Sequence, residues 1–120
     1  ELSLSKKELA PVLERFFAQK AKEKILSRVR YWQKETGLKA HWAGIYAFKA
    51  RWANCNEDNE VEFHPRCMEF SPAVMDYIIV HELCHTVHKE HNKAFWELVN
   101  AQYSEWQVCH DEVVSRGREI

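Results

Sequence analysis

Apolar residues recur every three or four positions between residues 6 and 36, which is the spacing of one face of an α-helix. The pattern predicts a long N-terminal helix. Ser5 is suited to cap its start, and Gly37 is suited to end it because glycine readily adopts the left-handed conformation. Pro11 marks either a bend or the true first turn. The apolar positions are Leu9, Leu13, Phe16, Phe17, Ala21, Ile25, Val29 and Trp32.

Two later stretches carry the pattern of β-strands. Residues 39–49 are rich in aromatic and branched side chains, and residues 61–64 alternate apolar and polar side chains. A polar, acidic turn at residues 54–59 separates them, so the two strands are expected to form a hairpin or a meander. Pro65 is expected to stop the hydrogen bonding of the second strand or to place that strand at an edge.

Three further helices are expected in the second half of the chain. The pair Ser71-Pro72 is typical of a helix start, and this helix is expected to cover residues 72–89. Asn92 is suited to cap a helix over residues 93–101, and a last helix is expected over residues 104–118. The chain should therefore change direction just before Asn92.

The composition fits one globular domain over residues 1–120. The chain is 46% hydrophobic, which is enough for a core, and its net charge is −1. Bulk charge therefore predicts neither a nucleic-acid nor a membrane partner, and we find no apolar run that could span a bilayer and no signal-peptide pattern. Because the chain begins at Glu1 without Met, it is expected to be a processed or excised piece of a longer protein.

The distribution of charge and the positions of the cysteines say little about function. Up to residue 36 the chain carries nine Lys and Arg against five Asp and Glu, which indicates a solvated helix surface or, alternatively, a weak polyanion-binding face. The cysteines form no C-x-x-C pair, so a zinc ribbon is not expected, and we interpret them as reduced thiols in a cytosolic setting. They are Cys55, Cys67, Cys84 and Cys109.

The candidate chemistry lies in the stretch His81-Glu82-Leu83-Cys84-His85. Residues four apart share a helix face, so His81 and His85 can direct their imidazoles at one metal ion. Glu82 is turned by roughly 100° around the helix, where it can take a proton from a water on the metal. This is the H-E-x-x-H pattern of a zinc hydrolase. The alternative is a chance pairing of solvated histidines in a chain that contains seven.

A third ligand is expected from the corner before the next helix. His91 lies in that corner and can turn back toward the metal. His88 is the alternative, but it would lie about 10 Å along the helix axis from His81, too far to share one ion comfortably. Cys84 is interpreted as a small buried hydrophobe, or alternatively as a thiol that blocks the metal when it is oxidised.

These motifs resemble the YgjP-type zinc metallopeptidase family. Residues 77–85 (Y-I-I-V-H-E-L-C-H) and 91–96 (H-N-K-A-F-W) match its metal-binding string, and residues 51–55 (R-W-A-N-C) resemble its R-W-G-S-C element. Residues 61–72 fit another of its segments without a gap, although His64-Pro65 replaces Asn-Trp. The same H-E-L-x-H-x5-H-x3-F-W spacing occurs in SprT-like and WLM proteases, which act on proteins crosslinked to DNA.

The resemblance implies that His81, His85 and His91 bind Zn²⁺ and that Glu82 is the catalytic general base. It implies an α+β, minimal zincin-like domain. That domain has a long N-terminal helix, a small antiparallel-containing β-sheet, an active-site helix and C-terminal helices. It further implies that the strand at residues 61–64 lies beside the active-site helix, where a peptide substrate pairs as an added strand.

The expected function is hydrolysis of peptide bonds in protein or peptide substrates by a cytoplasmic zinc metallopeptidase, or a nuclear one in a eukaryote. One alternative is a protease that acts on DNA-associated proteins, for which only the basic first helix argues. The other is a zinc-stabilised interaction domain without catalysis, and the intact Glu82 favours the enzyme over it.

Candidates for stabilising the oxyanion are, by chemistry alone, Arg51, His64, Arg66 and Tyr103. We interpret Trp52, Phe95 and Trp96 as core. Substrate, cleavage preference and oligomeric state are left open.

Overall fold

The computed structural model describes residues 5–120 and begins with helix α1, Lys6–Thr36. Both predicted caps are present. The Ser5 hydroxyl accepts a hydrogen bond from the Glu8 backbone N–H, and Gly37 closes the helix in the left-handed conformation with φ 76°. Because the helix begins at Lys6, Pro11 lies inside it and not in its first turn.

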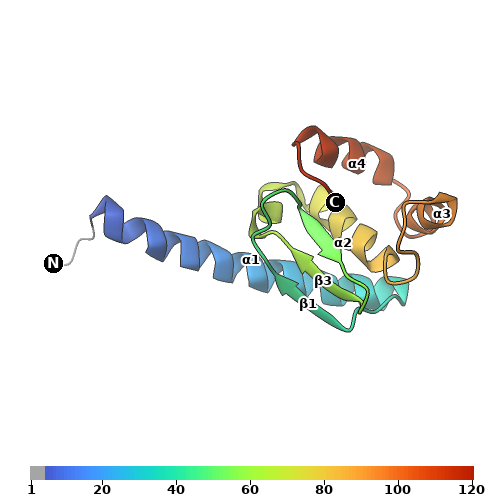
Figure 1. Ribbon diagram of the computed structural model, residues 1–120, viewed down its shortest axis with the longest axis horizontal. Helices are drawn as coiled ribbons and strands as arrows, with labels where there is room; N and C mark the ends of the chain where they lie inside the picture. The colour runs from blue at the N-terminus through green and yellow to red at the C-terminus, as the bar shows by residue number, and fades with distance from the viewer. Residues whose placement is uncertain (1–4) are drawn as a thin grey trace.

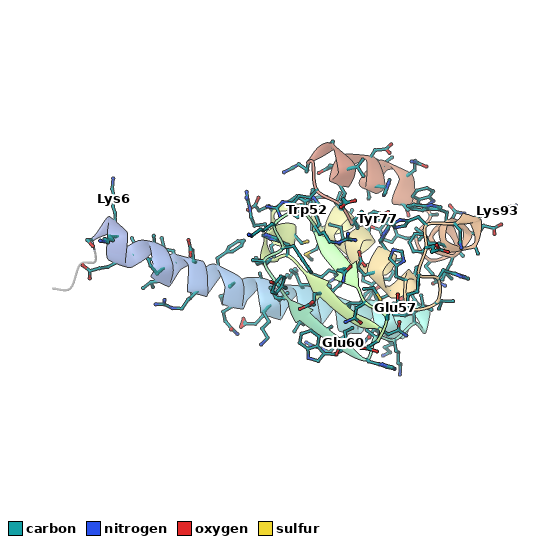
Figure 2. The ribbon with its side chains drawn as sticks, in the orientation of Figure 1. Lys6, Trp52, Glu57, Glu60, Tyr77 and Lys93 are labelled. Atoms are coloured by element: carbon teal, nitrogen blue, oxygen red, sulfur yellow. The ribbon has the colours of Figure 1, made fainter. Side chains whose placement is uncertain are left out.

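The two halves of α1 have different surroundings. The C-terminal half buries Ala21, Ile25 and Val29 against the rest of the protein. The N-terminal half projects away from the body with Lys6 near its free end (Figures 1 and 2), and residues 6–20 are all exposed. Phe16 in that half is 62% exposed. The apolar periodicity therefore predicted the helix correctly, but only part of its apolar face is covered within this chain.

A three-stranded mixed sheet packs against the helices in the order β1-β3-β2. Its strands are β1 (Trp42–Ile45), β2 (Ala53–Cys55) and β3 (Glu60–Phe63). Strand β3 is central: it pairs with β1 in parallel and with β2 in antiparallel fashion. The buried side of the sheet includes Val61 and Phe63, both fully inaccessible to solvent.

The expected hairpin between residues 39–49 and 61–64 is wrong. Those two segments are parallel, and the true hairpin joins β3 to β2, a strand that we did not predict. The first segment ends as a strand at Ile45, after which the chain crosses to the other edge of the sheet. The turn between β2 and β3 is stabilised by Asn56, whose side-chain oxygen accepts the backbone N–H of Asp58 and of Glu60.

The strand beside helix α2 is also different from the one expected. Helix α2 packs against β2, one of the two edge strands of the sheet. Strand β3 lies in the middle, between β1 and β2. Pro65 lies just beyond the end of β3 and begins the 3-10 helix η1 (Pro65–Glu69). It therefore stops the hydrogen bonding of β3, which was the first of the two expectations for this residue. Any peptide added to this side of the sheet would therefore meet β2 and not β3.

Helix α2 (Pro72–Cys84) runs through the core, and all its residues from Val74 onward are buried. The Ser71 side chain caps it as predicted by accepting the Val74 backbone N–H. The helix ends five residues earlier than expected. The Thr86 hydroxyl donates to the Leu83 carbonyl, and a side chain that binds the backbone in this way competes with the helix.

Two short helices complete the fold beside α2 (Figure 1). They are α3 (Lys93–Gln102) and α4 (Trp106–Ser115). Asn92 caps α3 as predicted, because its side-chain oxygen accepts the Phe95 backbone N–H at 3.0 Å. The observed architecture is the predicted α+β class. None of the helices described, over residues 5–120, is long and apolar enough to cross a membrane.

Candidate metal centre

Three imidazoles converge at the C-terminal end of α2. The Nε2 atoms of His85 and His91 lie 3.1 Å apart, and those of His91 and His81 lie 3.2 Å apart. His81 and His85 come from α2, whereas His91 comes from the loop that leads into α3. This cluster contains His91 and not His88. The geometry therefore brings together the three histidines that the sequence favoured.

The spacing of these nitrogen atoms fits one zinc ion. Zinc–imidazole bonds of about 2.0–2.1 Å in a tetrahedral arrangement place neighbouring nitrogens about 3.3 Å apart. The two spacings of 3.1 and 3.2 Å are close to that value. Three neutral imidazoles would leave a fourth tetrahedral position open, which is the arrangement of catalytic rather than structural zinc sites.

Neighbouring groups hold two of the imidazole rings in place. The His85 Nδ1 atom lies 2.8 Å from the His88 backbone carbonyl, which can only accept, so Nδ1 carries the proton and Nε2 is free to bind a metal. Phe95 stacks on His85 with ring centroids 4.3 Å apart, and Trp96 stacks on His91 at 5.6 Å. His88 thus orients the His85 ring through its backbone carbonyl.

Burial keeps the three imidazoles neutral. It lowers the pKa of His81 well below the usual value, and repulsion from the neighbouring histidines, when these are protonated, lowers it further. Burial likewise lowers the pKa of His85 to about 4 and also lowers that of His91. Because only neutral imidazole binds a metal, the cluster is ready to do so at neutral pH without releasing protons.

Glu82 follows His81 in α2 and has one buried carboxylate oxygen without a partner. It is 1% exposed, and its Oε2 atom has no hydrogen-bond partner among the described residues. Burial raises the pKa of Glu82 to about 8, and the positive charge of Arg51 opposes this rise. A buried carboxylate oxygen without a partner is costly, so this position is suited to a water molecule or a cation.

Comparison with known proteins identifies the family of this chain. The family model described as YgjP-like, metallopeptidase domain, matches residues 2–115. The chain belongs to the YgjP-like metallopeptidase domain family. Its fold is similar to the crystal structure of the metallopeptidase zymogen of Pyrococcus abyssi abylysin, with a TM-score of 0.65 and 18% identity over 80% of this chain and 98% of that one. No curated protein sequence matches the chain significantly.

Membership of the YgjP-like family confirms the predicted family and the predicted enzyme class, a peptidase. A metallopeptidase requires a metal ion and acts on protein or peptide substrates. Within residues 5–120, one group of three or more His, Cys, Asp or Glu side chains has donor atoms close enough together to hold one ion. That group is the three-histidine cluster.

Of the four oxyanion candidates in this YgjP-like chain, Arg51 acts electrostatically on the centre. Its positive charge lowers the pKa of Glu82 and contributes to the lowered pKa of each clustered histidine. Its Nε–H donates to the Ala53 carbonyl on β2, which fixes the guanidinium next to the outer strand. Its Nη1 atom also lies 3.9 Å from the Glu119 carboxylate.

The other three candidates also have structural partners, and none of them acts on the pKa of all three clustered histidines. The His64 Nδ1 atom accepts the Arg66 backbone N–H and so caps η1. The Arg66 guanidinium forms an ion pair with Glu69 on the surface. The Tyr103 hydroxyl donates to the Ala73 carbonyl at the start of α2. Each of these interactions supports an element and leaves the cluster untouched.

Two residues beside the cluster were not identified from the sequence. The Tyr77 hydroxyl lies 2.9 Å from Nδ1 of His81 and 2.8 Å from Nδ1 of His110 on α4. Tyr77, labelled in Figure 2, was interpreted only as part of the apolar start of the helix. Its position four residues before His81 is a signal that could have shown the contact. His110 carries no such signal, because the fold brings α4 to α2.

Proposed function

We propose that this chain is a zinc peptidase in which His81, His85 and His91 hold one Zn²⁺ and Glu82 is the general base. The observation that carries the proposal is the convergence of three imidazole Nε2 atoms, with the buried and unpartnered carboxylate oxygen of Glu82 on the residue after His81. A set of three imidazoles favours zinc among the common biological metals, together with an open position for substrate.

Zinc in such a site lowers the pKa of a bound water to about 7 and polarises a carbonyl group. With the metal bound, Glu82 would accept the proton of the attacking water at its unpartnered Oε2 and would pass it to the amine nitrogen that leaves. Burial raises the pKa of Glu82 in the metal-free protein, and a bound cation would favour the ionised form that can accept a proton.

Strand β2 is suited to hold the peptide substrate. The two residues that flank β2 form hydrogen bonds on the side of β3. The Trp52 carbonyl accepts the His64 N–H, and the Asn56 N–H donates to the Glu60 carbonyl. In an antiparallel ladder, Ala53 and Cys55 therefore direct their N–H and C=O groups away from β3, although the Ala53 carbonyl already accepts the Arg51 Nε–H. A peptide that adds to this edge as a strand would lie next to α2 and its histidines.

Arg51 is the side chain suited to the charge that develops on the substrate. Its guanidinium is anchored at β2, and its positive charge reaches Glu82 and the histidines. A fixed cation next to a carbonyl oxygen that gains negative charge stabilises the transition state more than the ground state. We therefore assign oxyanion stabilisation to Arg51 rather than to His64, Arg66 or Tyr103.

The Glu82→Gln substitution tests this function. The zinc-loaded variant should keep one zinc ion per chain and lose about 10²–10⁴-fold in the rate of cleavage of an unfolded protein, because Gln cannot accept a proton. The matched control is Glu97→Gln on the exposed surface of α3, which should cleave at the wild-type rate.

Two outcomes would decide against the proposal. Unchanged cleavage by Glu82→Gln would show that another group is the base. Zinc binding by the wild type without cleavage of any unfolded protein or peptide tested would instead support a zinc-stabilised interaction domain.

A further inference from the structure

A chain of three side chains links the histidine cluster to α4. The Tyr77 hydroxyl contacts Nδ1 of His81 at 2.9 Å and Nδ1 of His110 at 2.8 Å. Tyr77 is fully buried, and His110 is half-buried. A tyrosine hydroxyl has one proton, so it donates to one of these nitrogens and accepts from the other. Only two arrangements of protons are therefore possible in this network of His81, Tyr77 and His110.

The two arrangements differ in what His81 offers to a metal. If Tyr77 donates to His81, then Nδ1 of His81 has the lone pair and Nε2 carries the proton, so the proton points into the cluster. If Tyr77 donates to His110, then Nδ1 of His81 carries the proton and its Nε2 lone pair faces His91 at 3.2 Å. Only the second arrangement allows His81 to bind a metal.

His81 differs in this respect from its neighbour His85. The partner of His85 Nδ1 is a backbone carbonyl, which admits a single arrangement. The partner of His81 is a hydroxyl, which admits both, so the state of His81 depends on what lies beyond Tyr77. That residue is His110, whose ring is parallel to that of His81 within 13° and is packed edge-on against Trp96 at 5.1 Å.

We propose that His110 is a positioning residue of the metal centre: its Nδ1 accepts the hydrogen bond of the Tyr77 hydroxyl, so that Tyr77 accepts from Nδ1–H of His81 and the Nε2 lone pair of His81 is free for zinc. In the loaded protein, His81 donates from Nδ1 to the Tyr77 oxygen, Tyr77 donates to Nδ1 of His110, and His110 carries its own proton on Nε2. The inference rests on the proposed zinc site, and it adds a residue of α4 to the groups that hold the metal.

Nitrogen NMR of the zinc-loaded wild type tests the arrangement directly. The ¹⁵N shifts and long-range couplings of the His110 ring should show an unprotonated Nδ1 and a protonated Nε2, and those of His81 should show a protonated Nδ1. A protonated Nδ1 on His110 in the loaded protein would overturn the proposal, because Tyr77 would then have to accept from it.

Zinc affinity provides the second test, with variants chosen to change one contact each. Tyr77→Phe removes the central hydroxyl, and His110→Phe removes the final acceptor while keeping a flat ring. Each should raise the zinc dissociation constant by about 10–100-fold, the usual effect of losing the partner of a ligating histidine. His110→Asn, whose side-chain oxygen can occupy a position near Nδ1, should recover part of the loss. His41→Phe, an exposed position before β1, is the matched control.

The outcomes separate this proposal from the proposed function. If the wild type binds zinc through the three histidines but both Phe variants bind it equally well, the role of His110 is wrong and the zinc site stands. If the wild type binds no zinc, the site and the network fail together. Circular dichroism of each variant distinguishes a lost contact from a lost fold, and the NMR result on the wild type does not depend on the variants.

Discussion

Glu82 illustrates how one residue can be costly to the fold and useful to the site. Its carboxylate is buried among apolar residues of α2, and one oxygen has no partner within the described chain. Burial alone favours the protonated form, so the pKa of Glu82 rises from its usual 4.5 to about 8. A nearby cation would favour the ionised form, so metal binding and the charge of Glu82 are coupled.

The metal-free protein should therefore lose stability as the pH rises from 7 to 8.5. The folded state holds the Glu82 proton up to about pH 8, whereas the unfolded state has lost it above about pH 4.5. Because the folded state binds more protons in this window, the free energy of unfolding falls with pH, by about 1 kcal/mol over this range. Urea unfolding in the presence of a chelator measures this change.

Glu82→Gln is the control for the pH effect. A glutamine does not titrate, so most of the decline should disappear in the variant, while the buried histidines contribute little above pH 7 in either protein. Equal pH dependence in the two proteins would show that the Glu82 carboxylate is already ionised at neutral pH in the folded, metal-free state.

At the residue scale, local spacing determined how much of the site could be predicted. The i,i+4 spacing put His81 and His85 on one face, and the cap at Asn92 placed His91 in a corner; the structure brings these three side chains together. His110 could not be predicted, since its contact with Tyr77 spans 33 residues and depends on where α4 packs.

The loop between α2 and α3 is the element that places His91. The loop is tied to the β2–β3 turn, where the Lys89 side-chain ammonium donates to the Asn56 carbonyl at 2.8 Å and to the Asn59 side chain. Asn59, in the left-handed conformation with φ 60°, in turn approaches the Thr86 carbonyl through its side-chain amide. These contacts, together with the Asn92 cap, fix both ends of the short loop.

Asn92→Ala should therefore affect both stability and metal binding. Loss of the cap leaves the Phe95 N–H without its partner and should cost about 1 kcal/mol in the free energy of unfolding. It should also weaken zinc binding, because the backbone next to His91 is released. Urea unfolding and a zinc competition titration measure the two effects.

Ser5→Ala provides a matched loss of a helix cap far from the site. Ser5 caps the projecting end of α1, so its loss should change the global free energy of unfolding by less than about 0.5 kcal/mol and leave zinc affinity unchanged. Equal zinc affinity in Asn92→Ala and the wild type would contradict the role assigned to this cap.

At the element scale, helices were predicted better than the sheet. Caps such as Ser71 and Asn92 act within one turn, so the sequence marks them directly. Strand order depends on which segments meet across the molecule, and β2 has only three residues, too few for a recognisable alternation. The antiparallel partner of β3 was therefore missed, and with it the strand that faces α2.

The whole molecule consists of a body around the site and a projecting arm. The principal extents are 58 × 29 × 23 Å, and the long dimension follows the N-terminal half of α1 (Figure 1). The ion pair of Arg28 with Asp76, at 2.8 Å, joins the C-terminal half of α1 to α2 within the body. The histidine cluster is thus held entirely by the body, through α2, the following loop and the aromatic residues of α3.

The central claim is that one zinc ion is held by three imidazoles at the end of α2. The most direct measurement is anomalous scattering at the zinc edge from crystals of the zinc-loaded protein. We expect one strong peak about 2.0–2.1 Å from the Nε2 atoms of His81, His85 and His91. A peak bound instead by His88 or by the cysteine thiols, with the three-histidine cluster left empty, would contradict the account.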